Sequence, residues 1–380
     1  MIESALQPLT ALMGYVIPAL LVLTVVVFVH ELGHFLVARW CGIRVAAFSI
    51  GFGRELFGFN DRNGTRWKIS MIPLGGYVRF EGDENVASLP DADALAQVPP
   101  ERRAGLFHFA PLWRRAAVVA AGPAANFLLA IAVFAALFAT LGKPITVPRA
   151  DVVMPGSPAE QAGILPGDRI IAIDGNTIRS FSEIQRIVTL AAGEPLTITV
   201  DRAGAEIDVT ATPERREVSD GFGGTQRVGV LGISRNMTAD DVVFETYGPV
   251  AAVGEGARET WAIVERTMTY IGRLFQGRET ADQLSGPVRV AQVSGVVASS
   301  GGAVGLINLI AILSVSIGLL NLFPVPMLDG GHLVFYAIEA IRGRPLSARA
   351  QEYGFRIGFA LVLMLFVFVT FNDIVKISGI

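Results

Sequence analysis

Two histidines and a glutamate stand close together near the N-terminus, in the run His30-Glu31-Leu32-Gly33-His34. Histidines four residues apart share one face of a helix, so both imidazoles can bind one Zn²⁺. Glu31 lies about 100° round the helix, where its carboxylate can reach a metal-bound water. Zinc lowers the pKa of such a water to about 7, and a carboxylate beside it can take the proton. The spacing predicts a hydrolytic site with one zinc ion per chain.

This run lies at the end of an apolar stretch, 12–38, that is long enough to span a membrane. In a soluble protein the same run would be weak evidence for a metal. Each ionisable group at the centre of a bilayer costs about 2–3 kcal/mol, so three of them at ligand spacing are hard to explain as structure alone. The position therefore strengthens the prediction of a zinc site.

A catalytic zinc site needs a third protein ligand. Asp329 follows another apolar stretch, in the run NLFPVPMLDGGH (321–332), whose prolines and glycines break the helix. Irregular backbone at membrane depth is tolerated only where protein or a watery cavity satisfies it. We favour Asp329 as the third ligand over His332, which lies further towards the cytoplasm, and over His108, which lies in a polar loop.

Four apolar stretches must position these residues: 12–38, 116–141, 304–323 and 357–371. Of the 380 residues, 52% are hydrophobic and 17% are charged, against about 25% charged in soluble domains. This composition excludes a disordered chain, and the net charge of −3 argues against a nucleic-acid-binding protein. The predicted fold is an α-helical membrane protein of about four transmembrane helices with a soluble insert, and an oligomer is not implied.

The orientation follows from the basic residues that flank the apolar stretches, because cytoplasmic loops carry an excess of Lys and Arg. Residues 39–115 hold 11 basic residues and residues 330–356 hold four, whereas the N-terminus before the first stretch holds none. These two segments are therefore expected in the cytoplasm, with both termini and residues 143–302 on the other side. The active site then lies towards the cytoplasm.

The outer segment has two parts. From 145 to 236, short β-prone runs alternate with Gly/Pro turns and one helical run, which predicts a compact α+β module. From 237 to 302 the pattern is helical, and Trp261, Val264 and Met268 share one stripe with Ile271. Such a stripe lies on a surface formed by the bilayer or by neighbouring protein. On the cytoplasmic side, residues 83–111 are expected to form a flexible loop.

The two motifs HELGH and NLFPVPMLDGGH (321–332) resemble the paired motifs of the site-2 proteases, which are intramembrane zinc metalloproteases. Three further runs, FSIGFGRELF (48–57), IPLGGYVRFEG (72–82) and PLWRRAAVVAAGPAANF (111–127), are similar to the regulator-of-sigma-E protease (RseP-like) group in the same order. The resemblance covers nearly the whole chain.

This resemblance implies that His30, His34 and Asp329 bind the zinc and that Glu31 is the general base. It implies cleavage of single-pass membrane proteins within or beside the bilayer, as the second cut of regulated intramembrane proteolysis. The substrates it implies are already cut by another protease, and include anti-sigma-factor-like proteins and signal peptides. The location it implies is a bacterial inner membrane.

Residues 66–80 by themselves predict a β-hairpin, with turn residues at Pro73, Gly75 and Gly76. The resemblance implies that this hairpin (about 66–82) re-enters the membrane and pairs its edge with an unwound substrate. Pairing with a sheet edge satisfies the backbone of an extended peptide. Gly75, Gly76, Asn321 and Pro324 are the candidate substrate contacts.

Two asparagines have alternative interpretations. Asn321 either hydrogen-bonds the extended substrate or packs between helices, and Asn126 is similar but better interpreted as structural.

The outer module resembles a PDZ domain through GSPAEQAGILPGDRIIAIDG (156–175). Leu231, Gly232 and Ile233 fit its peptide-binding loop, and the space holds one such domain where many relatives carry two. Its role is a size filter or a docking module.

The predicted organisation places these parts along the chain as follows: first span 1–40, cytoplasmic-side region 41–114, second span 115–142, PDZ domain 145–236, amphipathic helical segment 237–302, third span with the Leu-Asp-Gly motif 303–332, cytoplasmic loop 333–355 and fourth span 356–375.

Two other functions remain as alternatives. A catalytically silent scaffold presenting the PDZ domain would be expected to lose Glu31 or a ligand. An ion transporter would need polar residues repeated through several spans.

Overall fold

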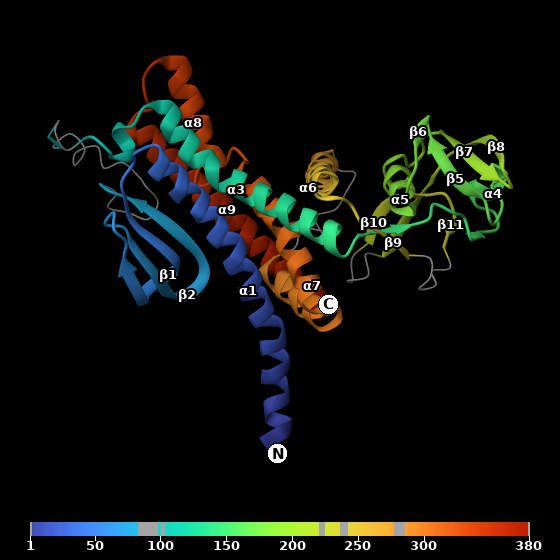
Figure 1. Cartoon of the computed structure of the whole chain (residues 1–380), viewed down its shortest axis with the longest axis horizontal. Coiled ribbons are helices and arrows are strands. Elements are labelled where there is room, and N and C mark those ends of the chain that lie inside the picture. Colours follow the sequence, from blue (N-terminus) through green and yellow to red (C-terminus); the bar gives the residue numbers. More distant parts are fainter. Residues whose placement is uncertain are drawn as a thin grey trace. The chain divides into compact units, whose positions relative to one another are not determined.

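The computed structural model describes residues 2–82, 98–99, 103–219, 225–235, 242–276 and 286–378. The predicted flexible loop (83–111) and the end of the predicted PDZ domain lie partly outside these residues. The chain divides into two compact units, which are described here one at a time. Figure 1 shows the elements of both, coloured along the sequence.

Four long helices dominate the first unit: α1 (Ile2–Trp40), α3 (Leu112–Thr140), α7 (Pro287–Asn321) and α9 (Ala348–Ser378). Each contains a segment long and apolar enough to cross a membrane, which confirms the four predicted spans. Helices α1 and α9 extend beyond the predicted apolar stretches at both ends, because helical hydrogen bonding continues into flanking polar residues, whereas α3 and α7 begin earlier than predicted but end one and two residues before the predicted limits 141 and 323.

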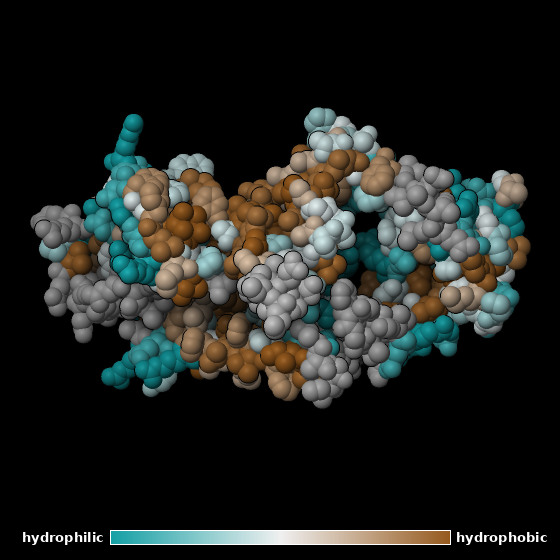
Figure 2. Space-filling model, turned by 90° about the horizontal axis from the view of Figure 1, so that it is seen from below, coloured by the Kyte–Doolittle hydropathy of each residue, from teal (hydrophilic) through white to brown (hydrophobic). Residues whose placement is uncertain are grey.

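The surface of these helices is apolar as well. In Figure 2, hydrophobic side chains gather over the helical unit. In the most apolar 18-residue stretch of α9, only 11% of the residues are buried, and Phe359, Leu363 and Phe366 are exposed. An exposed apolar surface of this extent marks contact with a membrane or with another protein.

Small residues let the helices approach closely. A Cβ on Gly33 in α1 would collide with the backbone of α3 at Ala121, and a Cβ on Gly318 in α7 would lie 3.1 Å from Cβ of Asn126. Such close packing lets a polar side chain on one helix reach the backbone of the next. Glycines therefore bring α3 close to both α1 and α7.

Helix α7 is interrupted at Gly302, whose φ of 55° and ψ of −144° suit glycine alone. A Cβ on Gly305 would lie 2.9 Å from the side chain of Val297, eight residues earlier, so the segment 287–301 folds back on the segment 303–321. The predicted third span corresponds to the second of these segments. The end of the predicted amphipathic segment (237–302) is therefore the first, apolar half of α7, and the amphipathic part is α6 (Pro249–Phe275).

Two long strands, β1 (Val45–Asn60) and β2 (Arg66–Phe80), pair beside α1. Residues 47–50 of β1 pair on one side with 66–69 and on the other with 76–79. The two halves of β2 thus flank β1, whereas the sequence predicted that they would pair with each other. Positive φ angles at Gly51 (86°) and Gly75 (121°) allow the strands to bend into this arrangement.

The second unit contains an antiparallel four-stranded sheet in the order β6-β5-β7-β8. The predicted β-prone runs coincide with β5, β7 and β8, and the predicted helical run coincides with α5, which Ser180 caps at its N-terminus. Ile170, Ile184 and Ile198 lie in its core, each at most 1% exposed. The strands and helices of the unit are β3 (Lys143–Thr146), β4 (Val152–Val153), α4 (Pro158–Gln161), β5 (Arg169–Ile173), β6 (Asn176–Thr177), α5 (Phe181–Leu190), β7 (Leu196–Arg202), β8 (Ala205–Ala211), β9 (Glu214–Ser219), β10 (Thr225–Val230), β11 (Ile233–Ser234) and β12 (Val242–Glu245).

Candidate metal centre

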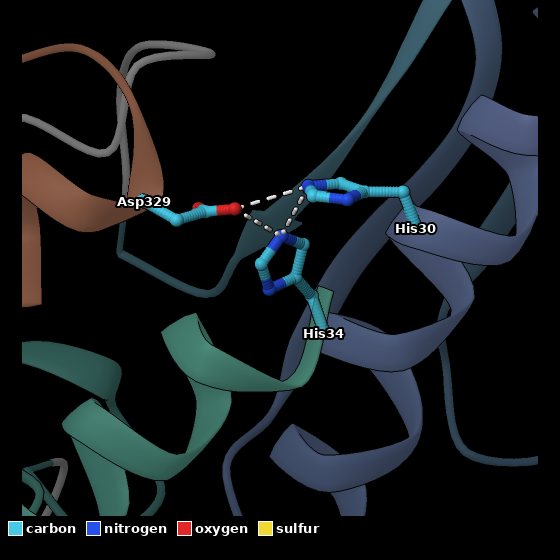
Figure 3. Close-up of side chains that lie close together, drawn as sticks. All are labelled: His30, His34 and Asp329. Carbon is cyan, nitrogen blue, oxygen red and sulfur yellow. Dashed lines mark hydrogen bonds and ion pairs between the residues drawn. The ribbon is translucent and has the colours of Figure 1, made fainter. Parts of the chain in front are cut away.

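His30 and His34 project from one face of α1 towards Asp329, the first residue of α8 (Asp329–Arg342), as Figure 3 shows. The Nε2 atoms of the two histidines lie 3.2 Å apart. Asp329 Oδ2 lies 3.0 Å from Nε2 of His30 and 3.5 Å from Nε2 of His34. The structure thus brings together the three residues predicted as metal ligands, although Asp329 is distant in sequence from the two histidines.

The chemistry of these three groups fits a cation. Two imidazole nitrogens and a carboxylate oxygen are all Lewis bases, and all three ligand atoms lie within 4.8 Å of one another. Two nitrogens and one oxygen are a donor set typical of catalytic zinc sites. Beside them, α3 carries Gly122, where a Cβ would lie 2.8 Å from Nε2 of His30 and still closer to Nε2 of His34. The absence of a side chain at this position leaves the metal-binding face of the histidines open.

Helix α3 also contacts the opposite nitrogens of both histidines. Nδ1 of His34 hydrogen-bonds the backbone carbonyl of Val118 at 2.8 Å, and Nδ1 of His30 lies 3.2 Å from the side-chain amide of Asn126. Pro123 lies inside the same helix and has no N–H to complete the backbone hydrogen-bond ladder there. The Nδ1 atoms are therefore engaged by α3 while the Nε2 atoms face Asp329.

Asp329 reaches the histidines because the chain turns sharply before α8. Helix α7 ends at Asn321 and α8 begins at Asp329, which confirms the predicted break. A Cβ on Gly330 would collide with the backbone carbonyls of Leu322 and Phe323, and one on Gly331 with that of Val325. The two glycines after Asp329 thus let the broken segment pack directly on the first turn of α8.

A cavity of about 410 Å³ adjoins the three ligand residues. Glu31 and Asn321 line it together with one edge of the sheet at Gly76, Tyr77 and Val78, and the Val78 backbone hydrogen-bonds the Glu31 carboxylate. Within the described residues, 76–80 pair with β1 along one edge, so the other edge borders the cavity. Glu31 therefore lies against this strand, beside Gly76 and Val78.

The remaining residues predicted from the sequence lie outside the group of three ligand side chains. His332 lines the same cavity but packs on Phe355, with ring centroids 5.3 Å apart, and burial lowers its pKa. His108 lies beside Phe107. Gly75 lies against the ring of Phe52, and Pro324 belongs to the broken segment.

Leu231, Gly232 and Ile233, predicted as a peptide-binding loop, lie in the second unit. The carbonyls of Leu231 and Gly232 accept hydrogen bonds from the backbone of Ala159 and Met154. Gly232 has a φ of +81°, and its Cβ would collide with Ser157. The loop is therefore held against the start of α4.

One pair near the site carried no signal of its own in the sequence. Arg115 of α3 and Glu339 of α8 form a two-pronged ion pair, with nitrogen–oxygen distances of 2.6 and 3.2 Å. The Arg115 guanidinium also lies 5.0 Å from the ring centroid of Tyr336. These contacts tie α8, which begins with Asp329, to the helix that holds Gly122.

Comparisons with known proteins also indicate a zinc site. The sequence model of peptidase family M50 matches residues 18–365. A protein of Rhizobium meliloti (strain 1021), named as a zinc metalloprotease, is 54% identical over 96% of this chain and 98% of its own length. Metalloprotease MmpA of Caulobacter vibrioides is 44% identical over 93% of this chain and 94% of its own. A zinc metalloprotease by name from Rickettsia conorii is 32% identical over 94% of this chain.

Proposed function

The chain belongs to peptidase family M50 and is a zinc metalloendopeptidase of the site-2 protease type, and we propose that it hydrolyses single-pass membrane proteins within or beside the bilayer. The observation that carries this proposal is the position of three metal-ligand side chains and a glutamate on one cavity between spanning helices. Water and a peptide bond must meet in such a cavity for hydrolysis to occur at membrane depth.

We assign the roles by position. His30, His34 and Asp329 would hold the ion. When bound, zinc supplies a Lewis acid that polarises the peptide carbonyl and lowers the pKa of water. Glu31 takes a proton from the attacking water and passes it to the leaving amide nitrogen, as a general base and then acid. The Val78 backbone holds the Glu31 carboxylate at the cavity.

The substrate is proposed to bind as an extended strand. A helix hides its own peptide bonds, so a membrane-spanning substrate must unwind before it is cut. Residues 76–80 offer a strand edge to receive it, and Gly76 packs so closely on Glu31 that a Cβ there would lie 3.2 Å from Cγ of Glu31. Asn321 lines the cavity and Pro324 follows in the broken segment, so both remain proposed substrate contacts, with Gly75 at the bend of β2.

The second unit is proposed to act as a PDZ domain that filters or docks substrates already cut by another protease. In support, its loop at Leu231, Gly232 and Ile233 joins β10 to β11 beside α4.

We further propose that β1 and β2 re-enter the membrane, because Leu56, Phe57 and Met71 on them are exposed and apolar. The proposed location is a bacterial inner membrane, with both termini and the second unit on the periplasmic side.

The test uses the full-length chain purified in detergent, with a transmembrane peptide as substrate. The wild type should contain about one zinc per chain and cut the peptide. Glu31→Gln should keep the zinc and lose the cutting, since the amide cannot accept a proton. Equal cleavage by this variant would refute the assigned mechanism, and a wild type that binds zinc but cuts nothing would favour the scaffold alternative. Asp329→Ala should lower the zinc content, and unchanged content would move the third ligand to His332 or elsewhere.

A further inference from the structure

Asn126 is fully buried beside the metal centre and is only half satisfied. Its amide nitrogen lies 3.2 Å from Nδ1 of His30, while its amide oxygen has no hydrogen-bond partner among the described residues. A buried carbonyl oxygen without a donor destabilises the folded protein. The nitrogen and oxygen of an asparagine amide have nearly the same shape, so their assignment must follow the hydrogen bonds around them.

Turning the amide by 180° gives the oxygen a hydrogen-bond donor. The oxygen then accepts a hydrogen bond from Nδ1–H of His30, and the lone pair of His30 is left on Nε2, which faces Asp329 at 3.0 Å. His34 already has this arrangement, because the Val118 carbonyl can only accept and thus keeps the proton on Nδ1 of His34. Both histidines would then present Nε2 to the same point.

The backbone and Cβ of Asn126 are fixed independently of His30. Ser314 of α7 donates a hydrogen bond to the backbone carbonyl of Asn126 at 2.9 Å, and Gly318 of α7 packs on its Cβ. The asparagine therefore stands at the contact of α1, α3 and α7, where a change in helix packing would be transmitted to His30.

We propose that Asn126 is a positioning residue. Its amide oxygen accepts a hydrogen bond from Nδ1–H of His30 and so holds His30 in the tautomer that leaves Nε2 free to bind the metal. The proposal rests on the proposed function, because it takes His30 as a zinc ligand. Partners of this kind orient the ligating imidazole, and their loss lowers metal affinity by about 10–100-fold.

The test measures the Kd for Zn²⁺ of the full-length protein by competition with a chelator, and the visible spectrum after loading with Co²⁺. Asn126→Leu removes both polar atoms and should raise the Kd about 10–100-fold and change the Co²⁺ bands. Asn126→Asp keeps an acceptor and loses the donor, so it should bind zinc at least as tightly as the wild type. Asn321→Leu, the same change elsewhere in the cavity, should leave the Kd unchanged.

Each outcome bears on one claim. A tenfold weaker affinity in Asn126→Asp would overturn the proposal even if Asn126→Leu fails to fold, because it would show that Asn126 must donate. An unchanged Kd in a folded Asn126→Leu would also overturn it. His30→Ala separates this result from failure of the proposed site. If that variant keeps its zinc, the ligand assignment itself is wrong, whereas zinc loss in His30→Ala with an unaffected Asn126→Leu removes only the role of Asn126.

Discussion

At the scale of single residues, the space that Gly122 leaves is as important as the side chains around it. Its Cα hydrogen points at the two histidine nitrogens, and even a methyl group there would lie 2.8 Å from Nε2 of His30. The usual reason for glycine in a membrane helix is close helix packing. Here the same residue also keeps a volume free where an ion must sit.

We therefore expect Gly122→Ala to bind zinc at least about tenfold more weakly than the wild type while still folding. The new methyl occupies the approach to both nitrogens, so the loss is steric. Zinc content after dialysis against a chelator is the measurement. Gly254→Ala in α6 is the matched control, since nothing lies within 4 Å of its Cβ position. Full zinc loading in Gly122→Ala would show that the ion sits on another side of the histidines.

At the scale of elements, the position of α8 decides whether the site exists, because Asp329 is its first residue. The helix is short and follows a broken segment, so it depends on its neighbours for its orientation. The ion pair between Arg115 and Glu339 fixes this orientation, and the two side chains are only 15% and 16% exposed. Two parallel hydrogen bonds fix both distance and angle.

We expect Glu339→Gln to destabilise the protein by about 3 kcal/mol, because it leaves a largely buried guanidinium without its countercharge. It should also weaken zinc binding, since α8 carries Asp329. Chemical denaturation in detergent and zinc competition are the measurements. Glu352→Gln breaks the exposed pair with Arg356 on α9 and should have a much smaller effect on both. If the double swap Arg115→Glu with Glu339→Arg does not recover part of the loss, the pair is not what orients α8.

A second ionic element stabilises the other unit. Arg202 donates to both oxygens of Asp168, at 2.8 and 2.7 Å, and these hydrogen bonds hold the pKa of Asp168 below its usual value. A carboxyl whose pKa is lower in the folded state stabilises the fold above its unfolded value of about 4. This stabilisation is lost as the pH falls through the folded-state pKa.

Asp168→Asn should therefore speed hydrogen exchange in peptides from residues 143–219 at pH 7, and the difference from wild type should shrink below about pH 4. Comparison at equal pH removes the intrinsic pH dependence of exchange. Asp208→Asn, an exposed aspartate on the same sheet, should change little. A difference from wild type that persists undiminished at the lowest pH would mean that the charge of Asp168 is not what matters.

At the scale of the whole molecule, the described residues include four helices long and apolar enough to cross a membrane, and the proposed orientation puts both ends of the chain on one side. The single cysteine of the chain, Cys41, follows α1 directly and is partly exposed. The basic residues after α1 predict that this position is cytoplasmic, opposite to the second unit. One chain therefore carries a natural reporter of its own orientation.

In intact spheroplasts, a membrane-impermeant maleimide should label Glu206→Cys, made in a Cys41→Ser background, and should label wild-type Cys41 only after lysis. Glu206 is exposed in the second unit, so access to reagent depends on the side of the membrane alone. Labelling of Cys41 in intact spheroplasts and of position 206 only after lysis would reverse the proposed orientation.

The sequence by itself determined the local features: four apolar stretches, a helical pair of histidines within one of them, and an aspartate behind a broken helix. Length, hydrophobicity and helical period are properties of neighbouring residues, so they can be predicted without knowing the fold. The prediction that residues 66–80 pair with each other as a hairpin was wrong, because both halves of β2 pair with β1, and glycines with positive φ let the strands bend in ways that composition does not specify.

Only the tertiary structure decided how α3 completes the site. Val118 reaches His34 across 84 residues, Asn126 reaches His30 across 96, and Arg115 meets Glu339 across 224. Such contacts depend on where small residues let helices approach, and a glycine or asparagine in an apolar stretch has the same appearance whether it packs, kinks or positions a ligand. The chemistry could therefore be predicted from four residues, whereas the groups that orient them became visible only when three helices were packed together.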